Sequence, residues 1–141
     1  AVQIAGALAA AHEAFLVHRD IKPENIMIRP DGYVKILDFG LAKLVQPENA
    51  LGELKNERVN SNETAQGVIL GTVQYMSPEQ AKGEAIDLQT DIFSFGTVVY
   101  EMLTGKTPFQ ADSISETFAN LLKIEPPPLA RFASDAPDEL Q

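Results

Sequence analysis

Residues 18–25 read HRDIKPEN, residues 38–40 read DFG and residues 77–79 read SPE, in that order along a chain of 141 residues. Between the first two stretches, the apolar runs 26–28 and 33–37 flank a Pro-Asp-Gly sequence. Short apolar runs on either side of such a sequence predict a β-hairpin. The hairpin would bring the end of the first stretch back beside the start of the second.

The side chains of these stretches suit the transfer of a phosphoryl group from Mg-ATP to a hydroxyl. This transfer needs positioning and charge neutralisation more than covalent catalysis. Asp20 offers a carboxylate that can orient the hydroxyl and accept its proton, and Lys22 offers a cation for the phosphate. Asn25 and Asp38 offer the amide and carboxylate oxygens that Mg²⁺ prefers. Each stretch alone is common in surface loops, but their order and spacing make coincidence a poor explanation.

From about residue 1 to about residue 130, the chain resembles the eukaryotic-type (Hanks-type) serine/threonine protein kinases, bacterial ones most of all. The resemblance implies that Asp20 is the catalytic base and that Lys22 contacts the γ-phosphate. It implies that Asn25 and Asp38 bind Mg²⁺, so ATP and Mg²⁺ are the expected cofactors. The expected acceptor is a serine or threonine of a protein substrate. We refer to residues 18–25 as the HRD loop.

The resemblance also gives supporting roles to five further residues. Phe39, which Gly40 follows, would pack against His18 in the active arrangement. Thr72 would bridge the catalytic base and the lysine beside it. Asp91 would be the buried aspartate that holds the backbone of the HRD loop.

Regulation can be read from the loop cations and the segment that follows. Arg19 precedes the base directly, and Lys43 follows the DFG stretch. In the family, such cations are neutralised by a phosphorylated residue that orders the activation loop. Residues 45–68 are polar and predict a long, flexible activation loop. Thr64 is the first candidate phosphosite and Ser61 the second, and both could also be plain polar loop residues.

Composition excludes several other classes. The net charge of −9 argues against nucleic acid and anionic membrane surfaces as partners. The chain has no cysteine, so it has no disulfide and no thiolate metal site. Its apolar runs are far shorter than the ~20 residues of a membrane span. We expect no membrane contact from this segment and a cytoplasmic location, although related kinases often carry a membrane span elsewhere and could dimerise in full length.

The remaining pattern is helical. Residues 2–14 are apolar all round, which predicts a buried helix. A helix is expected from about residue 91 to residue 104, with Gly105 placed to end it. Others should begin after Ser77, after Ser113 and near residues 136–140. The expected fold is mainly α with a small β-hairpin, like the C-terminal lobe of a protein kinase, whose full domain is α+β.

Residues 1–141 would then be a partial kinase catalytic domain that lacks the N-terminal lobe and the last helices. No glycine-rich loop precedes residue 18, and the first lysine is Lys22. In the family, Glu79 would pair with a buried arginine of a late helix, but Arg131 stands in the wrong sequence context, so we expect Glu79 to have no such arginine partner. A buried carboxylate without a partner is costly, so the fragment alone is expected to be poorly stable. Phe93 replaces the usual tryptophan, which should affect packing rather than chemistry.

Two alternatives stay open. Small-molecule kinases of the aminoglycoside type share the Asp-to-Asn spacing and a later metal aspartate, but they lack the Gly-Thr and Pro-Glu substrate loop found here. The chain could also be a catalytically inert kinase lobe that binds or scaffolds other proteins. The intact base, lysine and metal ligands favour an active serine/threonine kinase as part of a longer chain, with the fragment alone expected to be inactive.

Glu24 lies where related kinases contact a basic substrate residue.

Overall fold

The computed structural model describes residues 1–39, 43–44 and 73–132 of the protein. The predicted activation loop 45–68 and the predicted helix start at 136–140 lie outside the described residues. Within the described part, helices predominate and the strands form two small two-stranded sheets. This confirms the mainly α class with a small hairpin.

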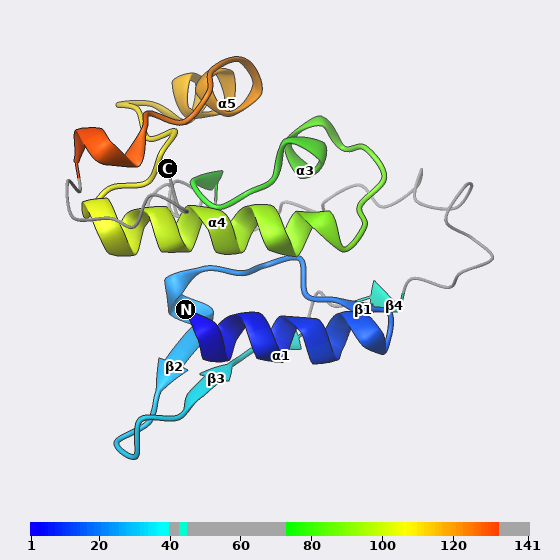
Figure 1. The fold of residues 1–141 in the computed structure, drawn as a ribbon. Helices are drawn as coiled ribbons and strands as arrows, with labels where there is room; N and C mark the ends of the chain where they lie inside the picture. The colour runs from blue at the N-terminus through cyan, green and yellow to red at the C-terminus, as the bar shows by residue number, and fades with distance from the viewer. Residues whose placement is uncertain (40–42, 45–72, 133–141) are drawn as a thin grey trace.

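The fold is built on two long helices that lie along each other, α1 and α4 (Figure 1). The hairpin of β2 and β3 extends from the α1 side, while α3 and α5 lie on the other side of α4. The elements in chain order are α1 (Val2–Glu13), β1 (Leu16–Val17), η1 (Pro23–Asn25), β2 (Ile26–Ile28), β3 (Val34–Ile36), β4 (Lys43–Leu44), α3 (Pro78–Lys82), α4 (Gln89–Thr104), α5 (Ile114–Lys123) and η4 (Leu129–Arg131).

Helix α1 is placed as predicted but is not buried. Only Ile4 and Leu8, one turn apart on a single face, are buried, and Val2 is 86% exposed. The prediction of a buried helix is therefore wrong for the described part of the chain. Alanine favours a helix whether it is buried or exposed. The many alanines made the helix apolar on every face, and this composition did not indicate which face is buried.

The predicted hairpin is confirmed. Ile26 pairs with Ile36 and Ile28 with Val34 in an antiparallel ladder. Gly32 closes the turn with a φ of 81°, a conformation that glycine adopts without steric cost. The Gln3 side chain attaches the turn to α1, because its Nε2 donates to the Gly32 carbonyl and its Oε1 accepts from the Val34 amide.

The predicted helix ends are also confirmed. Ser77 caps α3 by accepting a hydrogen bond from the Gln80 amide, and the Gln80 side chain accepts one from the Ser77 amide. This reciprocal pair is a capping box. Helix α4 begins two residues earlier than predicted, at Gln89, and Gly105 ends it with a φ of 73°. Ser113 caps α5 through the Glu116 amide.

One pair of strands was not predicted. Strands β1 and β4 are two residues long each, and they pair Leu16 with Leu44 and Val17 with Lys43. A two-residue strand is too short to show the period-2 alternation that identifies strands in a sequence. The pair joins the start of the HRD loop to the chain beyond the DFG stretch.

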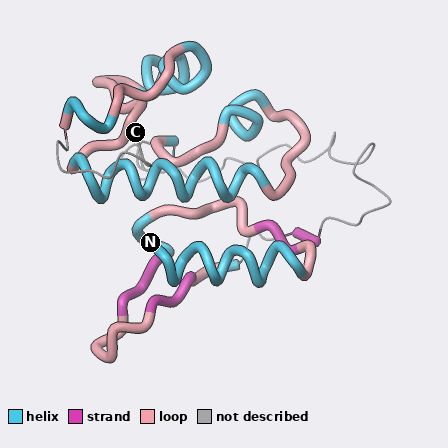
Figure 2. The backbone as a smooth tube through the Cα atoms, in the orientation of Figure 1, coloured by secondary structure: helices cyan, strands magenta, loops and turns pink. Residues whose placement is uncertain are grey.

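The buried core links both long helices to the HRD loop. Its central residues are Ile4, Leu8, Ile21, Tyr75 and Val98. Between β1 and η1 the chain forms the loop drawn in pink in Figure 2, which runs between α1 and α4. Ile21 of the HRD loop is therefore part of the core, so the loop is packed inside the molecule.

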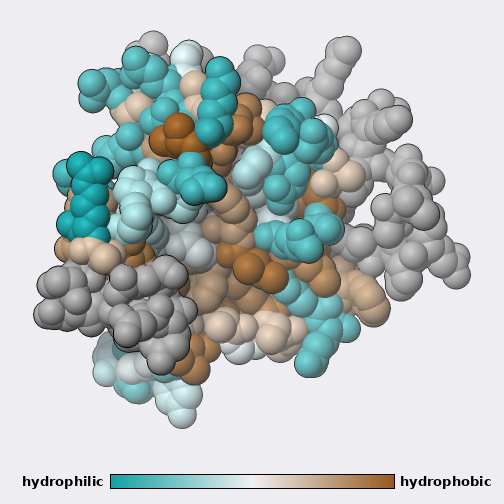
Figure 3. Space-filling model, turned by 45° about the horizontal axis from the view of Figure 1, so that its top comes forward, coloured by the Kyte–Doolittle hydropathy of each residue, from teal (hydrophilic) through white to brown (hydrophobic). Residues whose placement is uncertain are grey.

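Apolar side chains also reach the surface. Figure 3 shows brown apolar surface among the teal polar residues on one face of the molecule. On α4 and α5, exposed examples include Ile92 at 60%, Met102 at 64% and Leu122 at 40%. No helix in the described ranges combines the length and the apolar character that crossing a membrane requires.

Candidate active site

Asp91 fixes the backbone at the start of the HRD loop. Its side chain has no solvent exposure and lies in the first turn of α4. Its Oδ2 accepts from the His18 amide at 2.8 Å, and its Oδ1 accepts from the Arg19 amide at 2.7 Å. His12 of α1 approaches Oδ2 with its Nε2 at 2.9 Å. Three partners offset the cost of burying the carboxylate.

His18 is fully buried and links three parts of the site. Its Nδ1 accepts from the Asp20 amide at 3.2 Å, so its Nε2 carries the hydrogen that is donated to the Leu37 carbonyl at 3.0 Å. The Phe39 ring meets the His18 ring edge to face, with 4.5 Å between centroids. The contact that the resemblance implies between Phe39 and His18 is present.

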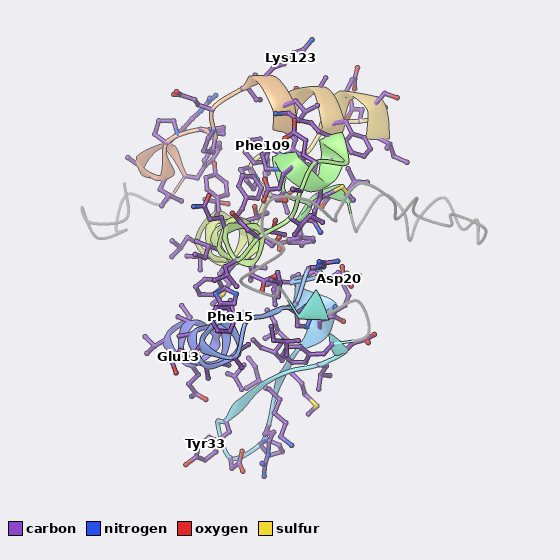
Figure 4. All side chains as sticks on the ribbon, turned by 90° about the vertical axis from the view of Figure 1, so that its right-hand side faces the viewer. Glu13, Phe15, Asp20, Tyr33, Phe109 and Lys123 are labelled. Carbon is purple, nitrogen blue, oxygen red and sulfur yellow. The ribbon has the colours of Figure 1, made fainter. Side chains whose placement is uncertain are left out.

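Asp20 is held by two neighbours within the HRD loop. Lys22 Nζ lies 2.8 Å from Asp20 Oδ2. Asn25 Nδ2 donates to the same oxygen at 2.9 Å and to the Asp20 carbonyl at 2.8 Å. Figure 4 shows Asp20 beside the two long helices, which are seen end-on there, at a level between α4 and α1. Both side-chain contacts involve Oδ2, so the carboxylate is oriented as well as charge-neutralised.

The hairpin places Asn25 and Asp38 next to each other along the backbone. The Leu37 amide donates to the Asn25 carbonyl at 2.7 Å, which extends the ladder by one step beyond Ile26 and Ile36. Asp38 follows immediately, with a φ of 58° and an exposed side chain. A non-glycine residue with positive φ is typical of strained backbone at functional sites.

The residues at this edge fit a magnesium ion that shares its coordination with phosphate and water. Asn25 uses its Nδ2 as a donor to Asp20, which leaves its Oδ1 as a possible ligand. Among the described residues, no three His, Cys, Asp or Glu side chains cluster as a metal cage. Mg²⁺ in phosphoryl-transfer sites is commonly bound by one or two protein side chains plus substrate phosphates. One amide and one carboxylate meet that requirement.

A second polar group lies beside the HRD loop on the α3 side. Tyr75 Oη donates to Glu101 Oε2 of α4 at 2.6 Å. Burial raises the pKa of Tyr75 well above its usual value, and the Glu101 hydrogen bond and the charges of Glu101 and Glu24 raise it further. Two carboxylates, Glu24 and Glu101, therefore act on one buried phenol.

Glu79 has a different partner from the one expected in the family. Thr90 Oγ1 donates to Glu79 Oε1 at 2.5 Å, whereas the Arg131 guanidinium lies over the Phe132 ring. Burial alone would raise the pKa of Glu79, but hydrogen bonds from Thr90 and the backbone outweigh it and lower that pKa. The prediction that Glu79 has no arginine partner is confirmed among the described residues, and a hydrogen bond from the Thr90 hydroxyl takes the place of that pair.

Comparison with known proteins identifies the family. Residues 1–138 match the family model described as "Protein kinase domain". The chain belongs to the protein kinase domain family. The geometry agrees with that membership, since the HRD loop contacts Asp91 on one side and Leu37 and Phe39, the two neighbours of the DFG aspartate, on the other.

Several bacterial relatives match this kinase domain closely. The serine/threonine-protein kinase PknL of Mycobacterium tuberculosis is 49% identical over 110 residues, which are 78% of this chain and 24% of that protein. The serine/threonine-protein kinase pkn3 of Myxococcus xanthus is 40% identical over 138 residues, 95% of this chain and 24% of that protein. A probable serine/threonine-protein kinase PknB of Bifidobacterium longum is 41% identical over 128 residues, 90% of this chain and 17% of that protein. This chain thus spans at most about a quarter of these relatives.

Sequence reasoning missed two residues that hold the HRD loop of this kinase domain. His12 contacts Asp91 across 79 positions, and Gln80 Nε2 donates to the Arg19 carbonyl at 2.7 Å across 61 positions. A lone histidine on a helix gives no signal of its partner. The Ser-x-x-Gln spacing predicts a capping box. It does not show that the side-chain amide of Gln80 also contacts the HRD loop.

Other predicted residues of the kinase domain have no described geometry. Gly40, Ser61, Thr64 and Thr72 lie outside the described residues. Lys43 lies in β4, where its backbone pairs with Val17. Their roles stay predictions.

Proposed function

We propose that this chain is the C-terminal lobe of a serine/threonine protein kinase that transfers the γ-phosphate of Mg-ATP to a protein hydroxyl. The observation that carries the proposal is the Asp20 carboxylate, held at Oδ2 by Lys22 and Asn25 on a backbone fixed by Asp91. Membership of the protein kinase family and relatives named serine/threonine-protein kinases support it.

Asp20 would act through the oxygen that its neighbours leave open. With Oδ2 engaged, Oδ1 would accept a hydrogen bond from the substrate hydroxyl and orient it. As the hydroxyl oxygen bonds to the γ-phosphorus, the bond from that phosphorus to the bridging oxygen would break, ADP would leave, and Oδ1 would take up the hydroxyl proton. Lys22, whose Nζ lies 2.8 Å from Asp20 Oδ2, would balance negative charge on the transferred phosphate. Thr72 would bridge these two residues.

Asn25 and Asp38 would hold the metal at the base of the hairpin. Bound Mg-ATP supplies the phosphoryl group, and the metal offsets the charge on its phosphates. Asn25 would present its Oδ1, because its Nδ2 is committed to Asp20. Asp38 would present its exposed carboxylate from the backbone turn that follows Leu37.

The acceptor would be a serine or threonine in a protein segment with a basic residue nearby. Glu24 and Glu101 both act on Tyr75, so negative charge gathers on the α3 side of Asp20. A lysine or arginine in the substrate would be attracted to that charge. Arg19 and Lys43 would receive a phosphorylated Thr64 or Ser61 as the regulatory step.

Other parts of a longer protein would cover the ATP side. No glycine-rich loop precedes residue 18 in this sequence. The exposed apolar side chains of the hairpin, Met27 and Ile28, face solvent in this chain and would be covered there.

The test is phosphoryl transfer by the natural full-length protein that contains these residues. Asp20→Asn should lower kcat by at least about a thousandfold. Asp31→Asn, in the hairpin turn, is the matched control and should leave the rate unchanged, because Asp31 pairs only with Arg29 and the Tyr33 amide in the described structure. A folded wild-type protein that binds partner proteins but transfers no phosphate would instead favour the inert scaffold.

A further inference from the structure

The Gln80 side chain makes two different hydrogen bonds with its two ends. Its Oε1 accepts from the Ser77 amide at 3.0 Å, as part of the cap of α3. Its Nε2 donates to the Arg19 carbonyl at 2.7 Å, in the HRD loop. The cap fixes Oε1, and this also orients Nε2, because the two ends belong to one planar amide.

The carbonyl that Gln80 holds belongs to the peptide unit directly before Asp20. The N–H of the same unit, on Asp20, donates to His18 Nδ1 at 3.2 Å. The two preceding N–H groups, on His18 and Arg19, donate to Asp91. Both sides of the Arg19–Asp20 peptide are therefore fixed, and Gln80 holds the carbonyl side.

The backbone on which this peptide is built has an unusual conformation at Arg19. Its φ is 71°, in the left-handed region that residues with a Cβ seldom adopt. Rotation of the Arg19–Asp20 peptide plane would change ψ of Arg19 and φ of Asp20, so it would re-aim the Asp20 side chain while Arg19 kept its positive φ. Gln80 and Asp20 line the same small cavity of about 20 Å³, together with Ile21, Tyr75 and Ser94 among others, so the two residues lie on one side of the loop.

We propose that Gln80 is a positioning residue that sets the direction of Asp20 by holding the Arg19–Asp20 peptide plane. One side chain thereby couples the start of α3 to the catalytic base. Its kinetic consequence rests on the proposed function, but its structural consequence does not. The competing view is that Gln80 only caps α3.

Two substitutions separate these views. Gln80→Glu keeps an oxygen for the Ser77 amide but removes the hydrogens that Arg19 accepts. Gln80→Met removes both bonds. Gln3→Glu is the matched control, because Gln3 makes the same pair of bonds, to a carbonyl and from an amide, at the hairpin turn far from Asp20.

The first readout is hydrogen exchange of the Asp20 amide in the natural full-length protein that contains these residues. We expect both Gln80 variants to raise its exchange rate about three- to tenfold, the range that the loss of one neutral hydrogen bond allows. Gln3→Glu should leave it unchanged. If the Asp20 amide of Gln80→Glu exchanges at the wild-type rate, the proposal is overturned. Should Gln80→Met fail to fold, the result for Gln80→Glu is sufficient to decide.

Low pH supplies a rescue that a purely structural role would not produce. Below about pH 4.3 the new glutamate becomes protonated and regains a donor. The ratio of variant to wild-type exchange should therefore return toward one for Gln80→Glu, but not for Gln80→Met. An unchanged ratio for Gln80→Glu across this range contradicts the proposal.

The second readout is kinetic and uses the natural full-length protein. We expect both Gln80 variants to lower kcat about tenfold while KM for the protein substrate changes less than about twofold, since the base is misaligned but the substrate surface is kept. A change in KM alone would overturn the proposal. A wild type without activity would count against the proposed function, while the exchange measurement would still decide the role of Gln80.

Discussion

Asp91 is the residue on which the order of the HRD loop depends most. It is fully buried, and its two oxygens receive the amides of His18 and Arg19 and the ring of His12. A buried acceptor that satisfies several donors is costly to remove, because each donor then lacks a partner. The strained backbone at Arg19 would lose its main hold at the same time.

Asp91→Ala should therefore lower the free energy of unfolding by about 3 kcal/mol or more. Asp112→Ala, at an exposed aspartate before α5, should change it by less than about 0.5 kcal/mol. Urea unfolding followed by circular dichroism measures both. Equal small effects of the two substitutions would show that Asp91 does not hold the loop.

Tyr75 is expected to make the free energy of unfolding decrease at alkaline pH. Its pKa is raised by burial first and by Glu101 next. The unfolded chain loses the phenol proton from about pH 10, while the folded chain keeps it. The folded state then binds more protons, so the free energy of unfolding falls as pH rises, by up to about 1.4 kcal/mol per pH unit.

Tyr75→Phe should remove this part of the alkaline loss, and Tyr33→Phe, at a 65% exposed tyrosine, should not. Unfolding in urea at pH 9, 10 and 11 gives the slope for each protein. A slope for Tyr75→Phe that matches the wild type would rule out this source of pH dependence.

At this scale, the sequence predicted the residues whose chemistry is local. Asp20, Lys22 and Asn25 lie within six positions, and their contacts follow from one loop. Gln80 and His12 were missed because their contacts cross 61 and 79 positions. Such contacts depend on how α1, α3 and α4 pack, which a single sequence does not show.

Among the elements, α4 connects most of the site. Asp91 in its first turn holds the HRD loop, Thr90 holds Glu79, and Glu101 near its end holds Tyr75. The helix ends at Gly105, whose φ of 73° suits glycine. Gly96 lies inside the same helix, and a Cβ there would meet, apart from the backbone of its own helix, no atom of the described residues within 4 Å.

The two glycines of α4 should respond to alanine with opposite signs. Gly105→Ala places a Cβ in the left-handed region and should destabilise the protein by about 1–2 kcal/mol. Gly96→Ala removes backbone freedom inside a helix and should stabilise it by about 0.5–1 kcal/mol. Thermal unfolding of the pair measures the difference, and shifts of the same sign would contradict this description of α4.

The elements that begin or end at a recognisable turn or cap residue could be predicted from the sequence. Pro-Asp-Gly marked the hairpin, Ser77 marked α3, and Gly105 marked the end of α4. The degree of burial of α1 could not be predicted, because alanine favours a helix in both buried and exposed positions. Strands β1 and β4 carry too few residues to show a pattern.

For the whole molecule, the main feature is that the HRD loop runs through the core. Leu8 of α1, Ile21 of the loop and Val98 of α4 belong to one buried cluster. Phe93, in the family's tryptophan position, stacks on Phe109 with 5.9 Å between centroids, so the substitution keeps an aromatic contact between α4 and the segment before α5. Stability and site geometry therefore share the same packing.

Leu8→Ala should lower the free energy of unfolding by about 2–4 kcal/mol, because the side chain is 4% exposed and its loss leaves a cavity. Met102→Ala, at a 64% exposed side chain of α4, is the control and should cost less than about 0.5 kcal/mol. Chemical denaturation compares them. A small effect of Leu8→Ala would mean that α1 does not pack on the loop.

The most direct measurement is the identity of the group that receives phosphate. The natural full-length protein is incubated with Mg-ATP and protein substrates, and the modified residues are identified by mass spectrometry, with Asp20→Asn in parallel. The account predicts phosphoserine or phosphothreonine with the wild type and neither with Asp20→Asn. A folded wild-type protein that modifies no serine or threonine, or an Asp20→Asn variant that still does, would contradict it.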